Sequence, residues 1–313
     1  MFALIYIILA LAALFFLIGK SATLLVKNLS HIAKYYNLND FILGFVILGF
    51  FTSTPELFIG IDSSLKGVPQ LSVGNLLGGA IILLSLIIGI VAVINKGVSI
   101  KKSFHLKDML LITLYICFPA LLILDARISR LDGFMLVAFY FLIIYWLWKT
   151  ESNVKVYMEN SRINLKKDLA FSIIGLGGVM ICAYFIVDIS NKLAAILKMP
   201  YILLGILILA FGTNLPELTI AIKSKHFRHE GLSLGNILGS AFANTFILGI
   251  ISLIKPIELP RVIPALITIL FLYWLLVLFT HSAETGRRIS FKEGLMHLGV
   301  YAVFILLQLA INF

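Results

Sequence analysis

Ten apolar runs follow one another along the chain, separated by short stretches that carry Gly, Pro, Asn, Lys and Asp. An α-helix of about twenty apolar residues spans the roughly 30 Å hydrocarbon core of a bilayer, and breaks of this composition are typical of loops. The pattern predicts an all-α polytopic membrane protein with ten transmembrane helices. The expected helices cover residues 2–20, 41–64, 71–94, 107–125, 131–148, 169–189, 201–222, 232–254, 262–280 and 294–312.

The overall composition supports this class. Of the 313 residues, 61% are hydrophobic and only 13% are charged, a balance that soluble globular proteins do not have. The formal net charge of +10 would suit a nucleic-acid-binding protein, but the basic residues lie in short loops between apolar runs. Membrane topology explains that distribution, so no nucleic acid partner is expected. Residues 2–19 follow no basic segment and predict a first transmembrane helix, not a cleaved signal peptide.

The basic residues also predict an orientation. Of the 25 lysines and arginines, 18 lie in the loops after the first, third, fifth, seventh and ninth expected helices, and seven lie in the remaining loops. Loops rich in Lys and Arg stay in the cytoplasm. We therefore expect a multi-pass protein of the cell (plasma) membrane with both termini extracellular.

The two halves of the sequence resemble each other at a fixed offset of 161 residues. Residues 52–59 (TSTPELFI) match 213–220 (TNLPELTI) at five of eight positions, and 71–80 match 232–241 at seven of ten. Five helices, an odd number, separate the copies, so the copies would lie in opposite senses in the membrane. This predicts an inverted-topology repeat, a signature of secondary transporters. The predicted units are a first repeat (1–149, motif 44–85), a cytoplasmic connecting loop (150–168) and a second repeat (169–313, motif 205–248).

Each repeat places a proline and a glutamate near the middle of a transmembrane run, in residues 52–57 and 213–218. A carboxylate at bilayer depth is costly and marks a functional site by default. The neighbouring proline breaks the helix and frees backbone carbonyls. One copy alone would be compatible with a kink whose glutamate is salt-bridged or protonated, whereas two symmetric copies favour a binding site built from Glu56 and Glu217.

The neighbouring residues suggest what the site binds. Two bare carboxylates at close range would repel, and one would hold a proton, unless a divalent cation or two monovalent cations lay between them. Further oxygens are available on the same helix faces and on the facing helices, from Thr52, Ser53, Thr213, Asn214, Ser240 and Asn244. Asn75 and Asn236 are compatible both with interhelical hydrogen bonds and with ligation. A set of oxygen ligands suits Ca²⁺, Na⁺ or Mg²⁺ and argues against Zn²⁺ or Cu⁺.

The duplicated T-[SN]-x-P-E-L, followed about twenty residues later by G-N-x-x-G-[GS], resembles the α-repeats of the cation/Ca²⁺ exchanger superfamily. In size and ten-helix plan the chain is most similar to prokaryotic Na⁺/Ca²⁺ exchangers. The resemblance implies that Glu56 and Glu217 are the central Ca²⁺ ligands. It implies supporting hydroxyl and carbonyl ligands from Thr52, Ser53, Thr213 and Asn214, and backbone carbonyl ligands from Gly49 and Ala210.

The chain departs from the pattern of these exchangers in the later polar positions. These correspond to Gly79, Leu83, Ser240 and Asn244, so the first repeat lacks both polar side chains. Asn244 stands where Asp is common, and Asn214 where Ser is usual. Fewer Na⁺ sites would remain, which leaves the counter-ion, the stoichiometry and the divalent cation open, since Mg²⁺ needs fewer protein ligands.

We therefore predict a secondary active cation antiporter, with Na⁺ entry driving Ca²⁺ export by alternating access. The second, third, seventh and eighth helices would form the site, and the first and sixth would slide or rock against that core. Alternatives are H⁺/Ca²⁺ exchange, Na⁺-coupled export of another divalent cation such as Mg²⁺, and, from a different class, a passive cation channel. No enzyme is expected, because there is no HExxH segment and no protease dyad. Small inorganic cations and the lipid bilayer are the expected partners, with no cofactor and no obligate protein partner.

Overall fold

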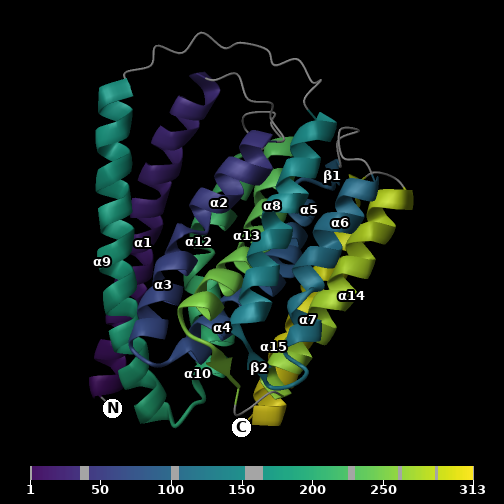
Figure 1. Cartoon of the computed structure of the whole chain (residues 1–313). Coiled ribbons are helices and arrows are strands. Elements are labelled where there is room, and N and C mark those ends of the chain that lie inside the picture. The colour runs from purple at the N-terminus through teal and green to yellow at the C-terminus, as the bar shows by residue number, and fades with distance from the viewer. Residues whose placement is uncertain are drawn as a thin grey trace.

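The computed structural model describes residues 2–35, 42–99, 106–151, 165–224, 230–259, 263–285 and 288–312, and these residues are mostly helical (Figure 1). The helices of the first half, with η marking π-helical segments, are α1 (Phe2–Tyr35), η1 (Ile42–Leu48), α2 (Gly49–Thr52), α3 (Thr54–Leu65), α4 (Pro69–Ile81), η2 (Ile82–Ile87), α5 (Ile88–Ile94), α6 (Leu106–Cys117), α7 (Pro119–Leu122) and α8 (Arg130–Glu151). Those of the second half are α9 (Leu165–Leu197), α10 (Tyr201–Leu204), η3 (Gly205–Leu209), α11 (Ala210–Thr213), α12 (Leu215–Ser224), α13 (Glu230–Ile254), α14 (Ile263–Thr285) and α15 (Phe291–Asn312).

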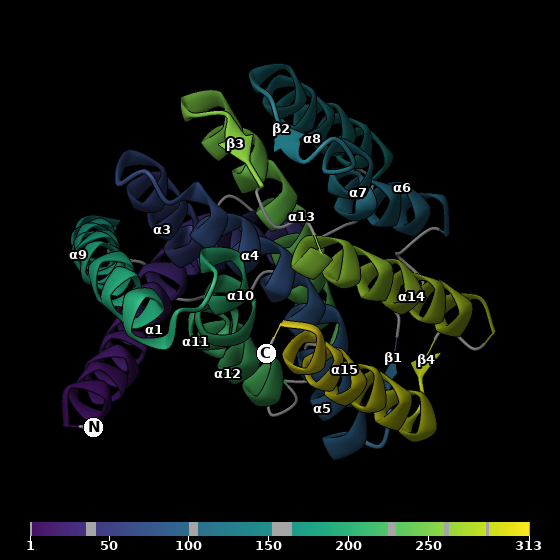
Figure 2. The same cartoon turned by 90° about the horizontal axis from the view of Figure 1, so that it is seen from below.

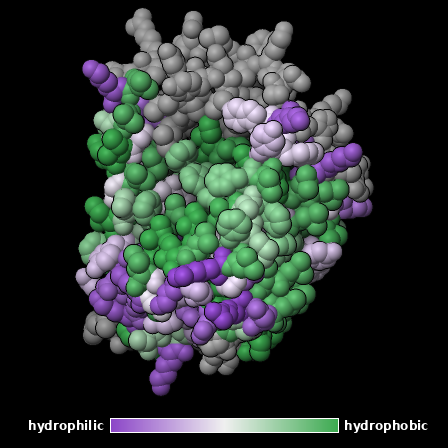
Figure 3. Space-filling view, viewed as in Figure 1, coloured by the Kyte–Doolittle hydropathy of each residue, from purple (hydrophilic) through white to green (hydrophobic). Residues whose placement is uncertain are grey.

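The chain is a helical membrane protein. Within the described residues, eight helices are long and apolar enough to cross a membrane, and a ninth span consists of two helices, Phe45–Thr52 and Thr54–Leu65, that meet at a 45° bend. Figure 3 shows hydrophobic residues across the middle of the molecule, with hydrophilic ones gathered near its lower edge. The span expected over 107–125 is divided into α6 and α7, because Pro119 cannot donate the backbone hydrogen bond that would continue α6. Each piece is shorter than a membrane span.

Two expected helices are longer than the hydropathy pattern predicts. α1 continues past Lys20 to Tyr35, and α9 extends beyond 169–189 in both directions. Residues 150–151 and 165–168, expected in the connecting loop, are therefore helical, and the rest of that loop lies outside the described residues. The two helices support each other, since they pack side by side along their length (Figure 2). Their contact is close at Gly175, where a Cβ atom would lie 2.8 Å from the Leu25 nitrogen.

A second apolar core joins the α1/α9 pair to the rest of the bundle. From the pair it contains Leu11, Phe15, Ile18, Val179, Ala183 and Ile186, and from the bundle Ile59, Leu71, Leu204 and Leu209. The larger core is built around α4 and α13, which lie at the centre of the molecule when it is viewed along the bundle (Figure 2). Both central helices are buried over most of their length, so they are positioned to carry an internal site.

Short strands and helix caps in the first half have counterparts in the second. β1 (Val98–Ser99) pairs with β4 (Arg288–Ile289), and β2 (Arg127–Ile128) pairs with β3 (Ile257–Glu258). The two small sheets lie toward opposite ends of the bundle (Figure 1).

A reciprocal capping box begins both α8 and α15. The backbone nitrogen of Ser129 donates to Asp132 at 2.7 Å, and that of Ser290 donates to Glu293 at 2.7 Å. In return, the nitrogens of Asp132 and Glu293 donate to the two serine hydroxyls. This motif satisfies backbone donors that the first helical turn leaves without partners. The two boxes are 161 residues apart, the offset found in the sequence.

Candidate functional site

Each Pro-Glu stretch breaks its helix at the residue two positions before the proline. Ser53 separates α2 from α3 with φ −79° and ψ 10°, and Asn214 separates α11 from α12 with φ −88° and ψ 8°. Pro55 has no N–H to donate to the carbonyl of Phe51, and the Thr54 hydroxyl donates to that carbonyl instead, at 2.6 Å. Sequence reasoning missed Thr54, although a hydroxyl directly before a proline in an apolar run is a usable signal.

The two glutamates lie inside the protein, next to these breaks. Glu56 is 1% exposed and Glu217 is 0% exposed, and both carboxylates have no hydrogen-bond partner within the described part of the chain. The carboxylates are close enough for their charges to interact. A buried charge is very costly unless it is paired, so this arrangement provides strong binding oxygens for a cation.

The threonines of the two stretches cross over. Thr213 faces the Glu56 carboxylate, and Thr52 faces that of Glu217, although neither pair is joined by a hydrogen bond of ordinary geometry. Each glutamate is thus accompanied by a hydroxyl from the other half of the chain. The expected convergence of residues 52–57 with 213–218 is present in the structure.

Asn75 and Asn236 have the same spacing from the Pro-Glu stretch in both halves of the chain, and each lies against the Pro-Glu stretch of the other half. The Thr52 hydroxyl lies 3.3 Å from Asn236 Oδ1, and that of Thr213 lies 3.2 Å from Asn75 Oδ1. These two contacts are equivalent at the 161-residue offset. Asn75 and Asn236 therefore join helices of different halves, which is one of the two roles that the sequence left open.

The remaining predicted ligands surround the breaks. The carbonyl of Gly49 accepts from Ser53 at 2.9 Å and from Ser240 at 3.3 Å, and Ser240 also lies 2.9 Å from the Thr52 hydroxyl. The carbonyl of Ala210 accepts from the Asn214 amide at 2.8 Å. These groups are present at the breaks as expected, but most of them are engaged with one another.

Two amide oxygens stay available. Asn214 and Asn244 use their Nδ2 groups as donors, to the carbonyls of Ala210 and Leu76. Their Oδ1 atoms are buried and have no hydrogen-bond partner among the residues that the structure describes. In the part of the chain that the structure describes, no three His, Cys, Asp or Glu side chains form a cluster. A cation here would therefore meet two carboxylates and neutral oxygens.

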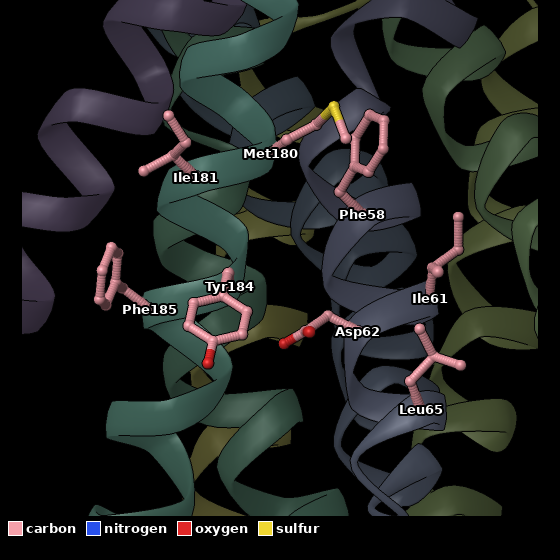
Figure 4. A pocket seen from close by; sticks show the side chains of 8 residues that line it. All are labelled: Phe58, Ile61, Asp62, Leu65, Met180, Ile181, Tyr184 and Phe185. Atoms are coloured by element: carbon pink, nitrogen blue, oxygen red, sulfur yellow. The ribbon is translucent and has the colours of Figure 1, made fainter.

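A second feature lies away from these residues, between α3 and α9. Phe58, Leu65, Met180 and Phe185 are among the mostly apolar side chains that line a groove of about 440 Å³. Figure 4 shows the single carboxylate of this groove, Asp62, opposite the ring of Tyr184. The groove is open to the outside of the bundle and is distinct from the buried glutamates.

Comparisons with known proteins cover almost the whole chain. Residues 6–149 and 167–310 match the family described as sodium/calcium exchanger protein. The "Uncharacterized membrane protein MJ0091" of Methanocaldococcus jannaschii is 30% identical over 278 residues, 88% of each chain. The "Sodium/calcium exchanger MaX1" of Methanosarcina acetivorans is 24% identical over 343 residues, 94% of this chain and 96% of the relative. A structure of the sodium-calcium exchanger NCX_Mj soaked with Na⁺ and Sr²⁺ superposes with a TM-score of 0.72 at 25% identity, covering 97% of this chain and 99% of that one.

Proposed function

The chain belongs to the sodium/calcium exchanger family, and from this premise we propose that it is a secondary active antiporter that exchanges Na⁺ for Ca²⁺ by alternating access. One observation carries the proposal. Glu56 and Glu217 are buried close enough for their charges to interact, and their four oxygens accept no hydrogen bond within the described residues, which favours a site that holds either one divalent cation or two monovalent ones. A site that accepts both loads, one at a time, is what exchange requires.

The central ligands in this proposal are the two glutamates. Thr52, Thr213 and the free amide oxygens of Asn214 and Asn244 complete the ligand set, with the carbonyls of Gly49 and Ala210 and the hydroxyls of Ser53 and Ser240 as further oxygens. Asn75 and Asn236 hold the threonines in place. All of these donors are oxygens, the ligand type that Ca²⁺ and Na⁺ prefer.

We also propose the ten-helix plan of two inverted five-helix repeats. The paired contacts at an offset of 161 residues support it, since they include the Thr–Asn contacts, the capping boxes and the helix breaks. In this plan α1 and α9, which pack side by side along their length, move as a unit against the bundle that holds the site. Both termini lie at one end of the molecule (Figure 1), and the distribution of basic residues assigns that end to the outside of the plasma membrane.

Two other antiport cycles compete within the class. In H⁺/Ca²⁺ exchange the glutamates would carry protons in place of Na⁺. In Na⁺-coupled export of a smaller ion, Mg²⁺ would replace Ca²⁺, which the lack of polar side chains at Gly79 and Leu83 favours. A passive channel would need no second ion.

Uptake of radioactive Ca²⁺ into proteoliposomes tests the proposal, with Na⁺-loaded and K⁺-loaded vesicles compared at matched pH and clamped voltage. We expect uptake only into the Na⁺-loaded vesicles. Uptake that follows an outward proton gradient instead would replace Na⁺ by H⁺ as the counter-ion. Uptake that follows voltage alone, with no stimulation by an internal ion, would identify a channel and refute the proposal.

A further inference from the structure

The site is chemically unequal on its two sides. At the 161-residue offset, Gly79 corresponds to Ser240, Asn214 to Ser53 and Asn244 to Leu83. One flank therefore carries two serine hydroxyls, and the other carries two amides around a glycine. The two glutamates, the threonines four residues before them, and Asn75 and Asn236 are identical in the two halves, so the difference among the candidate side-chain ligands lies at these three positions.

The structure explains how the three positions are linked. A Cβ atom at Gly79 would lie 2.9 Å from Nδ2 of Asn244 and 3.0 Å from Nδ2 of Asn214. Both amides thus occupy the space that a side chain at position 79 would take. They come from different parts of the chain, the α11–α12 break and α13, and meet at this glycine.

We propose that Gly79 determines which cation the site prefers, because it positions the amide oxygens of Asn214 and Asn244. This inference rests on the proposed function and adds a specificity-determining residue to it. Each amide is fixed through one Nδ2 hydrogen bond, at 2.8 Å to Ala210 and 3.3 Å to Leu76. A side chain at position 79 would push both Nδ2 groups away from these carbonyls and turn the two free oxygens with them.

The clash is one that the fold can absorb. The atoms that a new Cβ would meet are the ends of two asparagine side chains, which can rotate without moving the backbone. Gly79→Ala is therefore expected to fold, and its effect is expected to fall on cation binding. At Gly299, by contrast, a new Cβ would meet nothing within 4 Å, which makes Gly299→Ala a matched control.

Titration calorimetry of the purified protein with CaCl₂ and with MgCl₂ tests this inference. We expect Gly79→Ala to change the ratio of the Ca²⁺ and Mg²⁺ dissociation constants by about tenfold, and Gly299→Ala to leave the ratio unchanged. Adding Asn214→Ser to Gly79→Ala removes one of the two clashes and leaves the one with Asn244. In the Asn214→Ser background, Gly79→Ala should therefore change the ratio by only about threefold. Groups in direct contact are coupled in this non-additive way.

Other results would overturn the inference. An unchanged ratio in Gly79→Ala, or effects of Gly79→Ala and Asn214→Ser that simply add, would show that the glycine does not act through the amides. Because the readout is binding, its failure is separate from that of the proposed function. A protein that shows the expected change in binding but does not exchange Na⁺ for Ca²⁺ would keep this inference and lose the antiport.

A lysine side chain connects the α1/α9 pair to the rest of the bundle. Lys66 comes directly after α3, and its ammonium group lies 2.9 Å from the carboxylate of Asp62 in α3. The same ammonium group donates to the backbone carbonyl of Tyr184 in α9 at 3.0 Å and lies 3.7 Å from the centre of the Tyr184 ring. One lysine thus joins α3 of the bundle to α9 of the α1/α9 pair through Asp62 and Tyr184, two of the side chains that line the groove in Figure 4.

The sequence does not repeat this chemistry. The positions equivalent to Asp62, Lys66 and Tyr184 at the 161-residue offset are Lys223, Phe227 and Thr23. They supply neither a carboxylate near a lysine nor an aromatic ring on α1. If the two halves were identical in sequence, the conformations open to either side of the membrane would be equal in free energy. A contact that the other half does not repeat makes them unequal.

We infer that Lys66, Asp62 and Tyr184 form a latch that favours the conformation closed at this end of the bundle. The inference rests on the alternating-access part of the proposed function. A cation–π contact together with an ion pair at a partly buried site contributes more than an exposed ion pair. The pair Lys192–Asp188 is such an exposed pair, joined at 2.9 Å within α9 alone, and its lysine provides a matched control.

The test measures the access of water to Ile59, which is fully buried in the core shared with α1 and α9. Ile59→Cys is made in a background with Cys117→Ser and Cys182→Ala, and its labelling by a membrane-impermeant maleimide is timed. We expect Lys66→Met to speed labelling about fivefold and Lys192→Met to have no effect. Equal rates in Lys66→Met and its parent would refute the latch, whether or not the protein transports Ca²⁺, and retention of the slow rate in Lys66→Arg would support it.

Discussion

Glu56→Gln and Glu217→Gln are each expected to abolish Na⁺-driven Ca²⁺ uptake, with a loss of at least about 100-fold. Removing one member of a buried group of interacting charges costs about 3–5 kcal/mol, and about 1.4 kcal/mol corresponds to a tenfold change. The two carboxylates are fully buried and lack hydrogen-bond partners among the described residues, so a bound cation would depend on both charges. The measurement is Ca²⁺ uptake into Na⁺-loaded proteoliposomes at equal protein content.

The control for this prediction is Glu258→Gln, a substitution of the same type at an exposed position of β3. It is expected to transport like the unmodified protein. Because glutamine keeps the shape of glutamate, a folding defect should not hide the effect, and chromatographic behaviour in detergent checks this directly. If both single variants at positions 56 and 217 transported divalent cations normally, the proposed site would be wrong.

The placement of the central residues could be predicted because the sequence contains it twice. Residues 52–57 and 213–218 match at a fixed offset, and two helices that break at equivalent points bring their glutamates together. The structure contains this convergence, including the crossed Thr52 and Thr213. Family membership could likewise be predicted from the duplicated motifs, and the comparisons confirm it.

The helix ends were harder to predict, because they depend on tertiary packing. Lys20 suggested a loop after the first span, yet α1 continues to Tyr35 because α9 supports it along its length. Hydropathy identifies stretches apolar enough to span a membrane. It does not detect a helix that continues past such a stretch because it packs against another helix. Pro119 had the opposite effect, since it divides a run that hydropathy alone treats as continuous.

The linkage of Gly79 to Asn214 and Asn244 was also outside the reach of the sequence. The glycine could be recognised as a missing polar side chain, and the two asparagines as unusual substitutions, but each seemed to be a separate departure from the family. Only the spatial arrangement shows that the two amides fill the volume left by the glycine. The latch of Lys66 and Tyr184 was missed for the same reason, because its partners are 118 residues apart.

Gly239→Ala is expected to prevent stable folding, which is the largest effect on stability that we predict. Gly239 lies on α13 where that helix crosses the first repeat, and a Cβ atom here would overlap the carbonyl group of Phe45. The obstacle is backbone, so α13 and η1 would have to separate, in contrast with the side chains that yield at Gly79. Overpacking of a close interface costs about 3 kcal/mol, more than the roughly 1 kcal/mol that alanine gains over glycine in a helix.

The measurement is the midpoint of thermal unfolding in detergent, with Gly299→Ala as the control. Both substitutions add one methyl group to the interior of a helix, but at Gly299 the group meets nothing within 4 Å. Gly299→Ala should therefore unfold at the same temperature as the unmodified protein or above it, and Gly239→Ala well below it or not fold at all. Equal midpoints for the two variants would mean that α13 and the first repeat do not approach as closely as described. The positions assigned to Ser240 and Asn244, on the same stretch of α13, would then be wrong as well, because it is this close approach that brings them to the glutamates.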